Sequence, residues 1–171
     1  SKGFGSGYID NCGFLKDGYW FFKSIWTEEP VLHIFPHWNW QGHEGEIMRV
    51  GCYTNCDYAE LFVNGKSYGK KVIDFPRYGM DKGWGVPSGK KYSATTTDLH
   101  LGWDVEYQPG EIRIVGEKDG KMYEEVIRTF GEPSQIRLSV DRPEFSCKPG
   151  DVAHVTVEIL DKEGNLCKTA S

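Results

Sequence analysis

The chain has 171 residues, of which 39% are hydrophobic, 14% aromatic and 26% charged, and its net charge is −5 at pH 7. This apolar and aromatic content excludes an intrinsically disordered chain. Because Lys and Arg are scattered among a larger number of acids, there is no basic stripe for nucleic acid, and no apolar run approaches the ~20 residues that cross a bilayer.

The ends and the cysteines provide two further expectations. Residues 1–8 have neither the charged segment nor the apolar core of a signal peptide, and the chain does not begin with Met, so we expect a fragment of a longer protein. The five Cys, an odd number without a repeated CxxC spacing, argue against a disulfide framework or a zinc site. Cys52 and Cys56 are predicted to be small buried hydrophobes, and no metal or cofactor is expected.

Residues 1–30 have the pattern of one β-α unit. A short apolar stretch at Tyr8 and Ile9 is followed by a loop over 10–17 and then by apolar side chains at helical spacing. The side chains on this stripe are Tyr19, Phe22, Lys23, Ile25 and Trp26. Pro30 is expected to end the helix. A single β-α unit cannot bury its own strand, so it must pack against something larger.

From Val31 onward the apolar side chains alternate, which indicates strands. The predicted strands are 47–53, 58–63, 68–73, 100–107, 111–117 and 121–129. Asn64-Gly65 and Asp119-Gly120 can both adopt the positive φ angles of tight hairpin turns. Short strands at this spacing predict a mostly β domain over 31–130, an antiparallel β-sandwich of immunoglobulin-like architecture.

Two segments depart from this pattern. Residues 74–97 read as a long polar loop rich in glycine, which carries Trp84. After 131–133 the alternation resumes, first at Ile136, Leu138 and Val140 and then over 153–159. Two or three strands cannot complete a sandwich, so 131–171 is predicted to be the start of a second, incomplete β-sandwich.

Four segments carry a resemblance to a known family. They are GYIDNCGFLKD at 7–17, LHIFPHWNW at 32–40, YTNCD at 53–57 and ELFVNGKS at 60–67. In this order they resemble the C-terminal part of family 2 glycoside hydrolases of the bacterial β-galactosidase type, except that Leu15 stands where the family usually has Pro. The resemblance implies that 1–30 is the last β-α unit of a catalytic (β/α)8 barrel.

The resemblance also implies a chemistry that this chain does not itself contain. Family members cleave terminal β-galactosides by a retaining mechanism with two carboxyl groups about 5–5.5 Å apart. The family's acid/base Glu follows an Asn, yet none of the five Asn here precedes a Glu, and the nucleophile belongs upstream of Asp10. We therefore expect no catalytic residue. Galactoside, glucuronide or mannoside specificity stays open, and the family favours a periplasmic or extracellular location.

The loop over 10–17 is the best candidate for contact with substrate, because loops that follow barrel strands form the mouth of the active site. Phe14 is expected to line the sugar platform. Asp10, Asn11 and Lys16 are expected to hydrogen-bond sugar hydroxyls. In the alternative, purely structural interpretation, Asp10 and Asp17 cap the following helix and Phe14 packs beneath it.

Trp38 and Trp40, with His33, His37 and His43 nearby, form the densest aromatic cluster of the sequence. Packing between the sandwich and the barrel is the favoured interpretation, ahead of contact with sugar. A metal site is the least favoured, because Pro36 removes the helix that would align the histidines. Trp84 either reaches an active site or anchors its own loop.

Two other functions compete with that of an accessory region that packs on its own catalytic barrel. One is a stand-alone carbohydrate-binding module that uses Trp38, Trp40 or Trp84 as a platform, and the other is a purely structural adhesin-like sandwich. The incomplete barrel unit and the incomplete second sandwich also predict self-association, because both leave apolar faces and strand edges without their partners.

Overall fold

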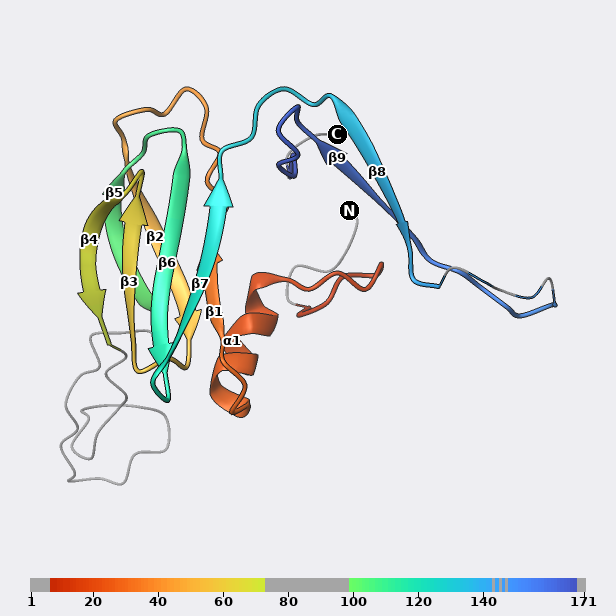
Figure 1. Cartoon of the computed structure of the whole chain (residues 1–171), viewed down its shortest axis with the longest axis horizontal. Coiled ribbons are helices and arrows are strands. Elements are labelled where there is room, and N and C mark those ends of the chain that lie inside the picture. Colours follow the sequence, from red (N-terminus) through yellow and green to blue (C-terminus); the bar gives the residue numbers. More distant parts are fainter. Residues whose placement is uncertain (1–6, 73–98, 143, 145, 147, 169–171) are drawn as a thin grey trace. The chain divides into compact units, whose positions relative to one another are not determined.

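The computed structural model describes residues 7–72, 99–142, 144, 146 and 148–168, and Figure 1 shows the course of the chain. Two compact units are present, Ser1–Ile127 and Arg128–Ser171. Trp84 and the rest of the predicted glycine-rich loop lie outside the described residues.

Helix α1, Asp17–Trp26, is the one helix among the described residues. Its first residue is acidic and Lys23 lies in its last turn, so both charges interact favourably with the helix dipole. The hydroxyl of Thr27 donates a hydrogen bond of 2.9 Å to the carbonyl of Lys23. The helix therefore ends four residues before Pro30, earlier than the sequence predicted, because Thr27 turns the chain into an extended conformation.

Strands between residues 32 and 128 form two antiparallel sheets. They are β1 Leu32–Phe35, β2 Ile47–Thr54, β3 Tyr58–Val63, β4 Lys66–Lys71, β5 Leu101–Glu106, β6 Glu111–Lys118 and β7 Lys121–Arg128. One sheet has the order β1-β2-β5 and the other the order β4-β3-β6-β7 (Figure 1). The predicted fold class, a mostly β antiparallel sandwich, is confirmed.

The core of this unit lies between the two sheets. Every second residue of β3 is buried, as is every second residue of β6 up to Gly116, which is the period expected of strands with one face in a core. The largest fully buried side chains come from both sheets and from the loops beside them: Trp38, Tyr107, Ile34, Leu61, Leu101, Ile112 and Ile114. Cys52 and Cys56 are buried, as predicted.

Both predicted hairpin turns are confirmed. Asn64 and Gly65 have φ angles of 48° and 82°, and Asp119 and Gly120 have φ angles of 51° and 75°. The first turn pairs Val63 with Lys66, so β4 begins two residues earlier than predicted. The register of β4 against β3 shifts between Glu60 and Phe62, opposite the left-handed Gly69, as in a β-bulge.

Strand β1 was not predicted, because both of its faces are covered and its side chains do not alternate between apolar and polar. Ile34 points into the core, while α1 packs against the other face of the β1-β2-β5 sheet. Trp20 of the helix stacks on the imidazole of His33, with ring centroids 5.0 Å apart, and Phe21 meets the edge of Tyr53 at 5.5 Å. The helix is thus fastened to the sandwich by an aromatic layer.

The side chain of Asn55 ties the segment between α1 and β1 to the loop that follows β2. Its Oδ1 accepts a hydrogen bond of 2.8 Å from the amide of Val31. Its Nδ2 donates to the carbonyls of Thr27 and Glu29, at 3.0 and 2.8 Å. The side-chain amide of Asn55 therefore satisfies three backbone groups of a segment that belongs to neither a helix nor a strand.

The second unit contains the hairpin of β8, Gln135–Val140, and β9, Val155–Leu160. Both predicted alternating segments are strands, although β9 begins two residues later than expected. Ile136 pairs with Ile159, Leu138 with Val157, and Val140 with Val155. Most of these side chains are exposed, Ile136 to 72% and Leu138 to 65%, so this hairpin has an apolar face that the described residues do not cover.

Candidate functional site

The predicted substrate loop is a tight turn that Asp10 organises. Oδ1 of Asp10 accepts hydrogen bonds from the amides of Cys12 and Phe14, at 2.8 and 2.9 Å. Its backbone pairs with that of Phe14, and a bridge between Ile9 and Leu15 closes the base of the turn. Asn11 lies at the exposed tip of the turn, and Phe14, opposite Asp10, is 53% exposed.

The turn brings Asp10, Asn11 and Phe14 together, and Lys16 lies at its base as the residue that precedes α1. No side-chain hydrogen bond caps the helix N-terminus. Asp17 instead contacts His33, and Phe14 is 53% exposed. The structure therefore does not support the alternative interpretation, in which Asp10 and Asp17 cap α1 and Phe14 packs beneath it. The turn presents an aromatic ring and an amide to its surroundings, a combination that suits a sugar.

The face of α1 that points away from the sandwich forms one wall of an apolar groove. Phe22 contacts both Tyr8 and Trp26, each with ring centroids 4.6 Å apart. The groove has a volume of about 400 Å³ and is lined by Tyr8, Ile9, Tyr19, Phe22, Lys23, Trp26, Thr27 and Glu29. Trp26 is 74% exposed, which is unusual for the largest apolar side chain.

Four of the five residues of the predicted stripe line the groove, all except Ile25. Trp20 and Phe21 form a second apolar face that the sequence analysis did not predict. The uninterrupted aromatic run from Tyr19 to Phe22 was the available signal, since four consecutive aromatic residues cannot all lie on one side of a helix. Two apolar faces mean that α1 is built to be covered on both sides.

Trp38 and Trp40 differ in their surroundings. Trp38 is 1% exposed, its Nε1 donates a hydrogen bond of 3.0 Å to the carbonyl of Gln108, and its ring meets the edge of Tyr107 at 5.0 Å. Sugar contact and packing against a barrel both require an exposed ring, and Trp38 instead belongs to the core of its own sandwich. Trp40 is partly buried and stacks on His37 at 4.6 Å, so it stays a candidate for either contact.

The three histidines of this region have separate partners. His33 contacts Asp17, His37 accepts from the amide of Asn39, and His43 lies 3.0 Å from Glu46. Within the described part of the chain, no group of three or more His, Cys, Asp or Glu is arranged to hold a metal ion. In the same part, no helix is both long enough and apolar enough to span a membrane.

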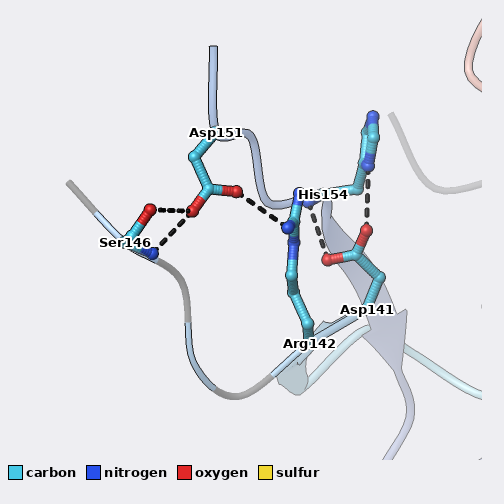
Figure 2. A network of polar contacts seen from close by, with 5 residues as sticks. All are labelled: Asp141, Arg142, Ser146, Asp151 and His154. Atoms are coloured by element: carbon cyan, nitrogen blue, oxygen red, sulfur yellow. Dashed lines mark hydrogen bonds and ion pairs between the residues drawn. The ribbon is translucent and has the colours of Figure 1, made fainter. Parts of the chain in front are cut away.

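Figure 2 shows a network of polar contacts among residues that lie between β8 and β9 in the sequence. His154 Nδ1 lies 2.9 Å from Asp141, and Arg142 lies 2.8 Å from Asp151. The hydroxyl of Ser146 donates to Asp151 at 2.9 Å and not to His154. In a Ser-His-Asp triad the serine hydroxyl is hydrogen-bonded to the histidine, so these contacts do not form a catalytic triad.

Comparison with known proteins agrees with these observations. Residues 45–124 match a family model described as a domain of unknown function (DUF4982). The chain is 40% identical to the β-galactosidase BoGH2A of Bacteroides ovatus, over 96% of this chain and 17% of that protein. It is 32% identical to a putative β-glucuronidase of Formosa agariphila, over 95% of this chain and 14% of that protein. The chain thus spans less than a fifth of the length of these relatives.

Solved structures extend the similarity to the fold. A β-glycosidase from Bacteroides vulgatus superimposes with a TM-score of 0.77 and 31% identity, over 96% of this chain and 19% of that one. A glycosyl hydrolase family 2 member from Bacteroides cellulosilyticus superimposes with a TM-score of 0.75 and 27% identity, over 95% of this chain and 22% of that one.

Proposed function

We propose that this chain, which corresponds to a segment of the family 2 glycoside hydrolases, is a non-catalytic region that braces the catalytic barrel of such an enzyme. In this proposal 1–30 is the last β-α unit of the barrel and 31–130 is the sandwich that supports it. Residues 131–171 begin a second immunoglobulin-like domain.

One observation carries the proposal: helix α1 has two apolar faces, and only one of them is covered by the sandwich. Trp20 and Phe21 fix one face of the helix to the sandwich, while Phe22 and Trp26 on the other face line an open apolar groove. An apolar groove of this kind on a protein surface marks a region that another element covers. In the proposed enzyme the neighbouring β-α units of the barrel fill this groove. Helix α1 then contacts the sandwich on one face and the barrel on the other.

The turn over 10–14 contributes to substrate binding in the proposed enzyme. It directly precedes α1, and loops in this position surround the active site of a (β/α)8 barrel. Phe14 offers an exposed ring to an apolar sugar face and Asn11 offers an amide to hydroxyls. Asp10 orients both, because its carboxylate already holds the amides of Cys12 and Phe14. The proposal also assigns to Lys16, the residue that precedes α1, a hydrogen bond with a sugar hydroxyl.

The substrate class that we propose for the longer enzyme is a terminal β-galactoside, with β-glucuronides as the alternative. The relatives named above include a β-galactosidase and a putative β-glucuronidase. Hydrolysis would proceed by the retaining mechanism, in which one carboxyl group protonates the leaving oxygen and another attacks the anomeric carbon. Both carboxyl groups would be contributed by the longer enzyme, outside the present 171 residues.

Two measurements on the purified chain test this function. Incubation with chromogenic β-galactosides and β-glucuronides should release nothing above a blank, and turnover at an enzyme's rate would refute a non-catalytic role. Calorimetric titration with galactose, lactose and glucuronic acid should show no saturable binding, because the proposed sugar contacts require the barrel. Saturable binding that is lost in Trp40→Ala would instead identify a stand-alone carbohydrate-binding module, since Trp40 is the described platform candidate that is not fully buried.

A further inference from the structure

The imidazole of His33 lies between two carboxylates that come from different elements. Its Nε2 is 2.9 Å from Oδ1 of Asp17, the first residue of α1. Its Nδ1 is 3.4 Å from Oε1 of Glu125, on β7 of the opposite sheet. The ring is stacked on Trp20 and the side chain is only 15% exposed. One side chain of β1 therefore contacts the helix and both sheets.

The positions of the two carboxylates determine the protonation state of the ring. A neutral imidazole has one N–H and one lone pair, so it would direct the lone pair at one of the two carboxylates. Only the imidazolium donates at both nitrogens. Burial of the ring lowers the pKa of His33, but the hydrogen bonds with Asp17 and Glu125 outweigh it and raise the pKa above the ordinary 6.5.

The other titratable groups packed around the ring do not replace these carboxylates. On β2, burial raises the pKa values of the Tyr53 hydroxyl and the Cys52 thiol, so both groups are neutral near pH 7. On α1, the ammonium of Lys23 lies over the ring of Trp20 and pairs with Glu29 at 2.8 Å. The imidazole of His100 contacts Tyr53, with ring centroids 5.9 Å apart.

Glu125 contacts a backbone group of β1 in addition to the imidazole of His33. Its Oε2 accepts a short hydrogen bond from the amide of Ile34. β1 lies at the edge of its sheet and β7 at the edge of the other, so this bond joins the two sheets where their edges meet. The carboxylate that faces His33 thus also satisfies an edge strand.

We propose that His33 is a protonation-dependent latch that fastens helix α1 to both sheets of the sandwich. When the ring is charged, Asp17 and Glu125 are both bound to it. Loss of the proton turns one of these bonds into a contact between a lone pair and a carboxylate, which loosens the helix while the aromatic layer of Trp20 and Phe21 stays in place.

The direction of the pH effect follows from the raised pKa. A group whose pKa is higher in the folded protein stabilises it fully below its ordinary pKa, and this contribution is lost as the pH rises through the folded value. The latch is therefore closed at mildly acidic pH, as long as the carboxylates are ionised, and opens as the pH rises through the pKa of His33. It concerns contacts within this chain and does not require the longer enzyme, so it can fail or hold independently of the proposed function.

NMR titration of the histidine rings in the full chain tests the latch. His33 should titrate above 6.5, and Asp17→Asn and Glu125→Gln should each lower its pKa by about one unit. Glu125→Gln keeps an acceptor for the amide of Ile34, which preserves the fold. The ring signals of His43, which is half exposed and pairs with Glu46, are the internal control for general changes in the protein.

Hydrogen exchange of the α1 amides provides the second readout. After correction for intrinsic rates, opening of α1 should become up to about tenfold more frequent when the pH rises through the pKa of His33, since one pKa unit corresponds to a tenfold change in an equilibrium constant. The change should disappear in Asp17→Asn. A His33 pKa at or below 6.5, or helix exchange that is the same on both sides of the titration, would overturn the proposal.

Discussion

The phenyl ring of Phe35 lies directly on the backbone of Gly51, its partner across the β1–β2 pair. A Cβ atom at position 51 would come within 2.3 Å of the ring atom Cζ, far inside van der Waals contact. The ring is also stacked on Tyr53 at 4.2 Å, which belongs to the aromatic layer under α1. The absence of a side chain at Gly51 is therefore what lets this layer lie flat against the sheet.

Gly51→Ala should destabilise the chain by about 1–3 kcal/mol, because a methyl group there displaces a ring that is held on both sides. Denaturant unfolding measures this loss. Gly102, the residue paired with Gly51 on β5, is the matched control. A Cβ at Gly102 would meet the flexible guanidinium of Arg49, which can move aside, so Gly102→Ala should cost clearly less. Equal losses would contradict the ring-on-backbone account.

The apolar face of the β8–β9 hairpin should make the isolated chain associate with itself. Leu138→Lys places a charge on this face and should shift light-scattering mass toward the monomer at high concentration. Ser139→Lys is its neighbour on the opposite face, where Ser139 pairs with Thr156, and should leave the mass unchanged. A monomer in the unsubstituted chain, or the same effect from both substitutions, would show that this face does not drive association.

Asp161 should make the second unit sensitive to acid. Its carboxylate accepts hydrogen bonds from the amide of Gly131 and from the side chain and amide of Asn165, which lower its pKa to about 2. A lowered pKa stabilises the fold above the ordinary value near 4, and this contribution is lost as the pH falls from about 4 to about 2.

Asp161→Asn, which carries no charge at any pH, is the comparison for this effect. Chemical denaturation followed through the amide signal of Gly131 should show the substituted chain to be less stable at pH 6 and the two chains to converge at pH 2. A constant difference between them across this range would mean that the ionised carboxylate is not the source of the stability.

The sequence predicted the sandwich well where its strands have one buried and one exposed face. β3 matches its predicted bounds, and both hairpin turns were identified from Asn64-Gly65 and Asp119-Gly120, because those pairs determine the turn locally. β1 was missed for the opposite reason. Its outer face is buried under α1, and a strand covered on both sides has no alternating pattern to recognise.

The contacts of His33 and the role of Trp38 were less predictable, because they depend on residues that are distant in the sequence. Asp17, His33 and Glu125 meet from a helix and two sheets, and no spacing in the chain relates them. The indole of Trp38 is a side chain typical of sugar platforms, yet it is buried against Tyr107 and is a core residue. Tertiary packing, which determines exposure, is what separates the two roles of a tryptophan.

The effect of Trp26→Asp on stability, compared between this chain and the longer enzyme proposed to contain it, tests the account most directly. In the chain alone the substitution should lower the unfolding free energy by about 1 kcal/mol at most, because Trp26 is 74% exposed and the new carboxylate meets only the C-terminal end of the helix dipole. In the longer enzyme it should cost several kcal/mol, since the proposed barrel contact would bury an unpaired carboxylate. Met122→Asp, on a 56% exposed side chain of β7, is the control and should be mild in both. An equally small loss for Trp26→Asp in the longer enzyme would contradict the claim that α1 joins the sandwich to a barrel.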